Sequence, residues 1–333
     1  MPNSSTKKSS RREFVLTLGA TAASISLAAE AKARVHQLEK PVKIGLIADL
    51  HQDIMHDGEA RLDDFLSEMD KVKPDAIMQL GDFAYPSKAN KPVIDKFNQA
   101  HATSLHVIGN HDTDSGHTKQ QCLDVWGMSD RFYHHDIGGL RFLVLDGNDK
   151  GSPTHQGGYV KFVGKQQVTW LKEQLKTFEG PVVVVCHQPL AGSSAIDNAK
   201  EIQQILSAHA DKVVLCLNGH THIDDLIQVE KISYLHVNSA SYKWVGGTYK
   251  HESYSPEIHK QHRWISSTCP YQDALFTTLT FDPASGTISI HGKESTWVGK
   301  SPDELGIVRN SQITDAEAVA PRIRSRQIER VEA

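Results

Sequence analysis

Short apolar runs alternate with stretches of helical spacing along most of this 333-residue chain. The run VKIGLIA over residues 42–48 is almost entirely apolar, which is typical of a buried β-strand. Residues 58–72 instead place Leu62, Phe65 and Met69 on one face of a helix. The same reasoning predicts strands over 42–48, 75–80, 104–109, 140–146, 181–186 and 212–217, and helices over 58–72, 91–101, 165–178 and 196–209.

The later part of the chain follows a different pattern. Residues 224–238 and 273–292 have the pattern of successive strands joined by turns, without an intervening helix. Strand–helix alternation that passes into paired strands favours mixed sheets covered by helices. We therefore predict an α/β fold in which helices lie outside mixed β-sheets, with no internal repeat.

Two segments have neither the spacing of a helix nor the alternation of a strand. Residues 240–271 carry Tyr242, Trp244 and Trp264 in a stretch too long for an ordinary connection. We interpret this segment as an inserted aromatic loop that caps a substrate by stacking, and a packing or dimer contact is the alternative. Residues 301–333 are polar and charged, which predicts a C-terminal surface extension.

The first 33 residues have the pattern of an export signal. A polar, basic start is followed by an apolar stretch over residues 14–29 and by small residues that end at Ala33. The Arg11–Arg12 pair resembles the bacterial twin-arginine signal. We expect cleavage after Ala33 and a periplasmic or secreted location for the mature chain, with its catalytic domain over 34–300.

The composition of the chain argues against some classes of function. The chain has 36 Lys and Arg against 40 Asp and Glu, and the predicted signal holds five and two of these, which leaves the mature chain with a net charge of −7. That charge argues against a nonspecific nucleic-acid binder, and no later apolar segment is long enough to span a membrane. Cys186 and Cys216 lie in apolar strands as buried thiols, whereas a disulfide between Cys122 and Cys269 stays an open alternative.

Metal-ligating residue types follow directly after several of the predicted strands. In open α/β sheets, the loops at the carboxyl ends of the strands meet at one edge and form the site. Five such loops here each deliver an oxygen or an imidazole, which are suitable ligands for metal ions. The residues are Asp49 and His51, Asp82, Asn110 with His111 and Asp112, His187, and His220 with His222.

The ordered set DxH, GDxx, GNHD, H and GHxH resembles the signature of the calcineurin-like metallophosphoesterases over about residues 42–238. The resemblance implies a four-layer α/β/β/α sandwich, in which two mixed sheets pack face to face with helices on both outer sides. It also implies two metal ions that share Asp82. The remaining ligands would be Asp49, His51 and His222 for one ion, and Asn110, His187 and His220 for the other.

The chemistry of these ligands suits first-row transition ions such as Mn, Fe or Zn. Two such ions clamp the attacking and leaving oxygens of a phosphate displacement, so hydrolysis is expected to begin with attack by a hydroxide that bridges the metals. By analogy with the family, His111 protonates or stabilises the leaving oxygen. Asp112 would then orient the imidazole of His111, and a local turn hydrogen bond is its competing role.

Charge balance favours phosphodiesters among small phosphate-ester substrates, with nucleotide-like esters as one candidate. Two carboxylates and a hydroxide leave two divalent ions with a net charge of about +1, which a diester monoanion neutralises and a monoester dianion exceeds. The alternatives are a phosphomonoesterase of the acid-phosphatase type and a non-catalytic metal-binding protein. The sequence does not determine the oligomeric state.

Two local similarities point to branches of this family. Tyr85, three residues after Asp82, resembles the iron-binding tyrosine of purple acid phosphatases, but those enzymes have glycine where this chain has His51. We therefore favour packing beside the site over a ligand role for Tyr85. Residues 157–171 are similar to a segment of cyclic-nucleotide phosphodiesterases, although Trp170 also fits the core of a helix.

Overall fold

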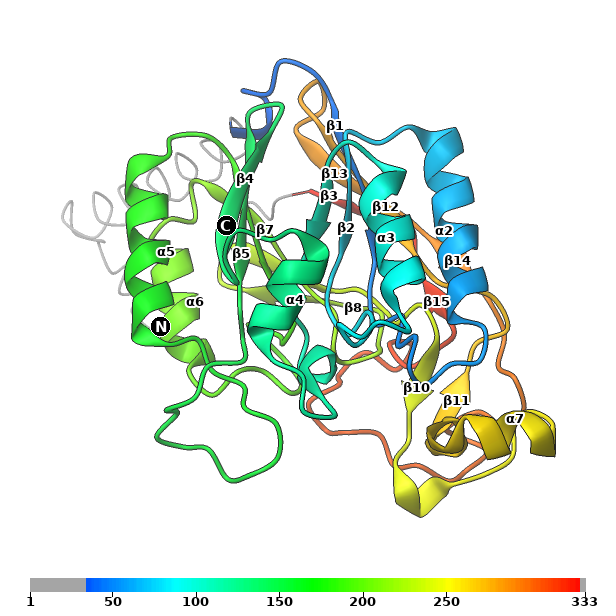
Figure 1. Ribbon diagram of the computed structural model, residues 1–333. Helices are drawn as coiled ribbons and strands as arrows, with labels where there is room; N and C mark the ends of the chain where they lie inside the picture. The colour runs from blue at the N-terminus through cyan, green and yellow to red at the C-terminus, as the bar shows by residue number, and fades with distance from the viewer. Residues whose placement is uncertain (1–33, 330–333) are drawn as a thin grey trace, which may run out of the picture.

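Two six-stranded β-sheets pack face to face in the computed structural model, which describes residues 34–329 (Figure 1). The predicted export signal over 1–33 lies outside the described residues. Across the first sheet the strands are, in order, β16 (Arg326–Ile328), β13 (Thr287–His291), β12 (Thr277–Asp282), β1 (Val42–Ile47), β2 (Ala76–Gln79) and β3 (Ser104–His106). Across the second sheet they are β4 (Tyr133–Ile137), β5 (Leu140–Leu145), β6 (Val182–Cys186), β7 (Val213–Asn218), β9 (Ile232–His236) and β8 (Asp225–Val229).

Helices cover both outer faces of the sandwich (Figure 1). The helices against the first sheet are α2 (Gly58–Val72), α3 (Lys91–Ala100) and α4 (Lys119–Trp126), and those against the second are α5 (Lys165–Thr177) and α6 (Ala199–Ser207). The predicted four-layer α/β/β/α fold is therefore confirmed.

Strand β5 contributes side chains to two hydrophobic cores, one on each face of its sheet. Because successive strand residues point to opposite faces, β5 contributes Phe142 and Val144 to the core between the sheets. Its Leu143 and Leu145 instead join the core beneath α5 and α6. Full burial of one such side chain contributes about 1.5–3 kcal/mol.

The parallel strands bring the predicted ligands to one edge. Strands β1, β2 and β3 run parallel, as do β5, β6, β7 and β9. The carboxyl ends of the parallel strands in each sheet therefore lie at the same edge. Every predicted metal ligand follows β1, β2, β3, β6 or β7 in the chain.

The expectation that residues 240–271 lack regular structure is wrong. The segment contains β10 (Tyr242–Trp244), which pairs antiparallel with β11 (Thr268–Pro270), the helix α7 (Pro256–Gln261) and two 3-10 turns, η2 (Gly247–Tyr249) and η3 (Arg263–Ser267). Helix α4 and strand β4 were also not predicted. Elements of three to eight residues are too short to show a clear hydrophobic period, so tertiary pairing defines them.

The expectation that residues 301–333 form only a surface extension is also wrong. Strand β16 pairs with β13 and becomes the edge strand of the first sheet. The buried carboxylate of Asp224 accepts hydrogen bonds from Arg324 Nε at 2.6 Å and from Arg326 Nη1 at 2.5 Å, which ties this segment to the loop after β7. The other strands are β14 (Lys293–Glu294) and β15 (Arg322–Ile323), which pair with each other. A polar edge strand lacks the apolar pattern on which sequence prediction depends.

The cysteines and the membrane prediction can be checked directly. All four cysteines are buried free thiols, so Cys186 and Cys216 match their prediction. Cys122 lies in α4 and Cys269 in β11, and the disulfide alternative between them is not formed. Within residues 34–329, no helix is long and apolar enough to cross a membrane.

Candidate metal centre

The turns that follow the parallel strands hold their ligands in an unusual backbone conformation. Asp49, His51, Asp82, His220 and His222 all have positive φ angles, between 49° and 67°. Residues other than glycine rarely adopt this left-handed conformation, which costs about 1–3 kcal/mol each. Such strain concentrated on five predicted ligands indicates a functional site rather than a set of ordinary turns.

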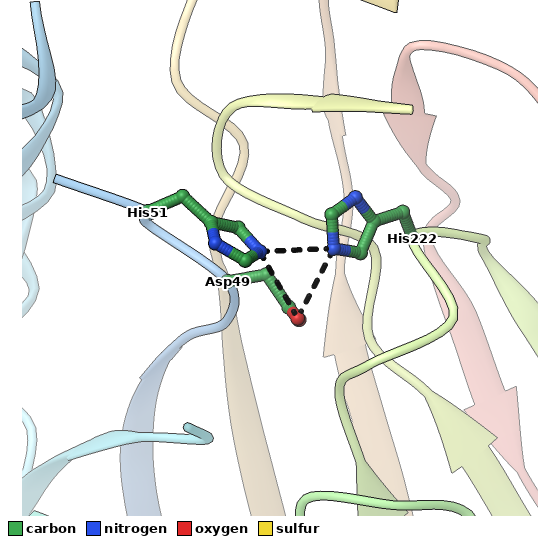
Figure 2. Close-up of side chains that lie close together, drawn as sticks. All are labelled: Asp49, His51 and His222. Carbon is green, nitrogen blue, oxygen red and sulfur yellow. Dashed lines mark hydrogen bonds and ion pairs between the residues drawn. The ribbon is translucent and has the colours of Figure 1, made fainter. Parts of the chain in front are cut away.

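The first ligand group combines one carboxylate with two imidazoles, those of Asp49, His51 and His222 (Figure 2). His222 Nε2 lies 3.2 Å from Asp49 Oδ1 and 3.2 Å from His51 Nε2. His51 Nε2 is 3.9 Å from the same Asp49 oxygen. Ligand atoms bound to one ion at about 2 Å are separated by distances of this size, so the group has the dimensions of a metal site.

The second ligand group consists of Asp82, His187 and His220. His187 Nε2 lies 3.1 Å from Asp82 Oδ2. The same Asp82 oxygen is 3.8 Å from His51 Nε2 in the first group. Asp82 therefore lies between the two groups, at the position that the sequence predicted for a shared ligand.

Hydrogen bonds on the far side of the rings fix two of the imidazoles. The Nδ1 atom of His187 lies 2.7 Å from the carbonyl oxygen of Leu80, and that of His222 lies 2.7 Å from the carbonyl oxygen of Tyr242. A carbonyl can only accept, so each Nδ1 carries a proton and each Nε2 is the nitrogen that faces the site.

Two glycines allow the loops to approach the ligands closely. Gly81 has a φ of 97°, and a Cβ atom on it would lie 2.4 Å from His187 Nδ1. A Cβ atom on Gly109 would lie 2.1 Å from Asp82 Oδ1. Any side chain at either position would displace a ligand, which explains the glycine in both motifs.

Asn110 provides an independent test of whether these residues fit a metal pair. Both of its amide atoms are buried and have no hydrogen-bond partner among residues 34–329. Leaving one buried polar group unsatisfied costs about 1–3 kcal/mol. Coordination through its carbonyl oxygen would satisfy that atom, so the residues present fit the two ions that the family implies.

The electrostatics of the groups also suit metal binding. Burial lowers the pKa of His220 to about 3 and holds the pKa of His51 well below its ordinary value, so both imidazoles are neutral at pH 7. Burial opposes ionisation of Asp82, but the neighbouring His187 overrides this and keeps its pKa well below the ordinary value. Although burial works against it, Asp82 in turn raises the pKa of His187 to about 9, so a bound cation would displace a proton there.

The hydrogen-bond partner of the His111 imidazole differs from the predicted one. Its Nδ1 atom lies 2.7 Å from Asp114 Oδ2, and its backbone N–H donates to Asp82 Oδ1 at 2.7 Å. Burial lowers the pKa of His111, but Asp82 and Asp114 outweigh it and raise the pKa overall. The prediction that Asp112 orients this imidazole is therefore wrong.

Asp112 instead binds the backbone of two loops, and the bond from Gly109 corresponds to the local turn hydrogen bond of its competing role. Its carboxylate accepts hydrogen bonds from the backbone N–H groups of Asp82, Phe83, Ala84 and Gly109 at 2.7–3.2 Å. These bonds join the loop after β2 to the loop after β3. Asp112 thus supports the ligands Asp82 and Asn110 and does not line the cavity described next.

A cavity of about 590 Å³ opens over both ligand groups. His111 lines it together with five of the ligand residues, His51, Asp82, Asn110, His220 and His222. Tyr85 also lines it, with its ring 5.6 Å from that of His117. Three exposed rings also line it, those of Tyr159, beside His111, and of Trp244 and Trp264, which together we call the aromatic wall; Arg263 lines it as well. Trp244 and Trp264 come from residues 240–271, so part of this segment does lie over the metal edge.

Sequence reasoning missed the supporting role of two residues beside the ligands, although it named Tyr242 as part of the aromatic loop. The buried ring of Tyr242 stacks on His51 with centroids 5.0 Å apart and lies 4.9 Å from the ring of His222. Lys243 donates from Nζ to the carbonyl oxygen of Thr221 at 2.7 Å, between the two histidines of the GHTH motif. Both lie in a segment without periodicity, and only their position after a predicted strand could have drawn attention to them.

The chain belongs to the calcineurin-like phosphoesterase family. The family model matches residues 42–224, which is more than half of the 333 residues and includes every predicted ligand. The resemblance inferred from the motifs is confirmed, and the protein is a metal-dependent hydrolase of phosphate esters. No curated protein matches this chain.

Solved structures share the fold at low sequence identity. A dimetal phosphatase from Danio rerio is 14% identical with a TM-score of 0.52, and the match covers 78% of this chain and 99% of that one. GAP50, the anchor in the inner membrane complex of Plasmodium, is 14% identical with a TM-score of 0.50, and the match covers 79% and 86%. One fold thus serves a phosphatase and an anchor, so the argument for activity in this chain rests on its family and its site.

Proposed function

We propose that this protein is an exported phosphoesterase that uses two transition-metal ions and prefers phosphodiesters. The observation that carries the proposal is that His111 and the aromatic wall line the same cavity as residues of both ligand groups. When bound, the ions would lower the pKa of a water molecule and neutralise charge on the phosphate oxygens. The proposal of export rests on the sequence pattern of residues 1–33.

The chain itself supplies the proton and the orientation. A phosphate seated on the ligand groups would lie beside His111, which lines the same cavity. The carboxylate of Asp114 lies 2.7 Å from His111 Nδ1 and, against the opposing effect of burial, favours an imidazole that carries a proton for the leaving oxygen. Water would form the new bond to phosphorus from the opposite side, as in-line displacement requires.

The aromatic wall supports an organic group on the ester. Four large hydrophobic side chains are exposed among residues 34–329, and three of them, at 42–48% exposure, form this wall. Exposed aromatic rings beside a polar cavity favour stacking on a planar base or aryl group, worth about 1–3 kcal/mol per ring. The guanidinium of Arg263 lies 5.0 Å from the centre of the Trp264 ring and extends this surface.

Charge supports the diester preference. Asp49 and Asp82 are the two carboxylates of the ligand groups. Two divalent ions and a bound hydroxide would leave this site at about +1, which matches the single charge of a diester. A diester also carries two organic groups, one of which can occupy the wall while the other departs beside His111.

The test is a substrate panel measured on the purified chain loaded separately with Mn, Fe or Zn, and again after treatment with a chelator. We expect kcat/KM to be higher for bis-p-nitrophenyl phosphate and cyclic nucleotides than for p-nitrophenyl phosphate. Chelation should abolish turnover, and one of the ions should restore it. Metal analysis of protein from the exported fraction identifies the native ions.

The other outcomes separate the alternatives. A higher kcat/KM for the monoester would assign the protein to the acid-phosphatase type. Retention of two ions without turnover on any ester would indicate a metal-binding protein. Recovery of the chain only from the cytoplasm would contradict export without affecting the chemistry.

A further inference from the structure

His111 forms part of a three-residue hydrogen-bond network whose other two members, Asp114 and Tyr159, lie outside the family motifs. Asp114 Oδ2 lies 2.7 Å from His111 Nδ1, and the hydroxyl of Tyr159 donates to the same Asp114 oxygen at 2.7 Å. The Tyr159 hydroxyl also lies 3.2 Å from His111 Nδ1, and the two rings have centroids 4.8 Å apart. Tyr159 is 48 residues away in the chain, so the network joins two separate loops.

The network leaves one nitrogen of His111 for the substrate. A carboxylate that accepts from Nδ1 holds the proton on that atom and fixes the plane of the ring. Nε2 is then the nitrogen that can serve the leaving oxygen. Asp112 is unable to take this role because its carboxylate is occupied by four backbone N–H groups.

We propose that Asp114 and Tyr159 are positioning residues for His111 and that Tyr159 links the aromatic wall to leaving-group protonation. The proposal rests on the function proposed above. In the step that they support, the bond between phosphorus and the leaving oxygen breaks, and its electron pair stays on that oxygen. The oxygen takes the proton from Nε2, while water forms the new bond to phosphorus and releases a proton to solvent. Nε2 regains a proton from solvent before the next turnover.

This role predicts a dependence on the leaving group. A poor leaving group needs its proton as the bond breaks, whereas p-nitrophenolate departs without one. Weaker positioning of His111 should therefore slow esters of basic alcohols and phenols far more than p-nitrophenyl esters. A residue that only stabilises the fold would affect both classes of substrate equally.

The experiment compares Asp114→Asn and Tyr159→Phe with the parent enzyme on a series of aryl methyl phosphates, from p-nitrophenol to unsubstituted phenol as leaving group. In the metal-loaded protein, we expect kcat on the phenyl ester to fall by about 10- to 100-fold and on the p-nitrophenyl ester by less than about threefold. KM and bound metal should stay within about twofold of the parent. Matched controls are Asp124→Asn, at an exposed site on α4, and Tyr249→Phe, which lies outside the cavity lining.

The results distinguish a failure of the positioning role from a failure of the proposed function. Equal loss on all leaving groups, or no loss on any, would overturn the positioning role. If His111→Ala also leaves every substrate unaffected, the proposed function fails at the same time, whereas a large loss in His111→Ala alone rejects only this inference. Tyr159→Phe removes one oxygen from a side chain that is 48% exposed, so the test remains decisive even if Asp114→Asn does not fold.

Discussion

The ligand side of the cavity, formed by the predicted metal ligands, and its aromatic wall are built in opposite ways. The ligand residues are almost all buried, five have strained backbones, and their rings and carboxylates are held by main-chain hydrogen bonds. The aromatic wall is formed by exposed rings on loops and on one short strand. Rigid placement is needed where charge develops, and adaptable contacts suffice where an organic group is held. Under the proposed function, the ligand side would determine the reaction and the wall would determine which ester enters.

The same comparison suggests how the protein can change. Substitution on the ligand side meets close contacts, such as those around Gly81 and Gly109. Substitution of Trp244 or Trp264 removes an exposed ring and leaves the buried clusters intact. Under the proposed function, substitutions in the wall would alter substrate preference and leave the ligand groups in place.

The largest effect is expected from Asp82→Asn, because this carboxylate contacts both ligand groups. The variant should bind fewer than two ions per chain and lose turnover of bis-p-nitrophenyl phosphate by about a thousandfold or more. Metal analysis and steady-state kinetics measure both quantities. Asp70→Asn, at an exposed site on α2, is the matched control. A variant with full metal and full turnover would contradict the role of Asp82 as a shared ligand.

His111→Ala separates metal binding from proton transfer within the ligand side. Because its ring is absent from both ligand groups, the variant should retain both ions. Turnover of esters with poor leaving groups should fall by about a hundredfold to ten-thousandfold, as expected for loss of a general acid. Metal content and kcat are measured on the same preparation. Unchanged kcat would remove His111 from the mechanism.

Trp264→Ala and Trp244→Ala test the wall, with a smaller effect expected. Loss of one stacking surface should lower kcat/KM for cyclic nucleotides by about 5- to 100-fold, and less for methyl p-nitrophenyl phosphate. Val308→Ala is the control, because Val308 is the fourth exposed large hydrophobic side chain and lies outside the cavity. Equal losses for both substrates would reject the stacking role. Point variants are preferable to deletion of residues 240–271, which would also remove Tyr242 from beneath the ligands.

The smallest expected effect is the pH dependence of the free energy of unfolding that arises from two buried histidines. Burial lowers the pKa of His106 to about 3 and that of His236, which supports Thr221 between two ligands, to about 4. Both rings stay neutral in the folded state, whereas the unfolded imidazoles bind protons as the pH falls below about 6.5. The contribution of these two histidines to the free energy of unfolding is therefore fully present above that pH. It decreases towards pH 4, by about 1–2 kcal/mol per histidine at pH 5.

Chemical denaturation of the metal-free protein at pH 7.5 and 5.0 measures this loss without interference from metal release. His106→Gln should show a smaller difference in unfolding free energy between the two pH values. His134→Gln, at an exposed site on β4, should behave as the parent. A parent whose stability is equal at both pH values would reject the prediction.

Much of the ligand side could be predicted from the sequence because each ligand is local to a strand end. Asp49, Asp82 and His187 each stand where an apolar run stops, and the parallel arrangement of such runs brings their ends together. The role of Asp112 could not be obtained in this way. Its neighbours along the chain permit a bond to His111, and only the fold shows that backbone N–H groups occupy the carboxylate.

By itself the sequence determined the layered α/β fold, the family and the residues that form the two ligand groups, because apolar periodicity and the motifs at strand ends are local properties. Only the tertiary structure decided that Asp114 and Tyr159 contact His111, that Tyr242 underlies the ligands, and that β16 completes a sheet. These contacts join residues far apart in the chain or depend on the paths of irregular loops. Their geometry follows from how the whole chain packs, and no local spacing records it.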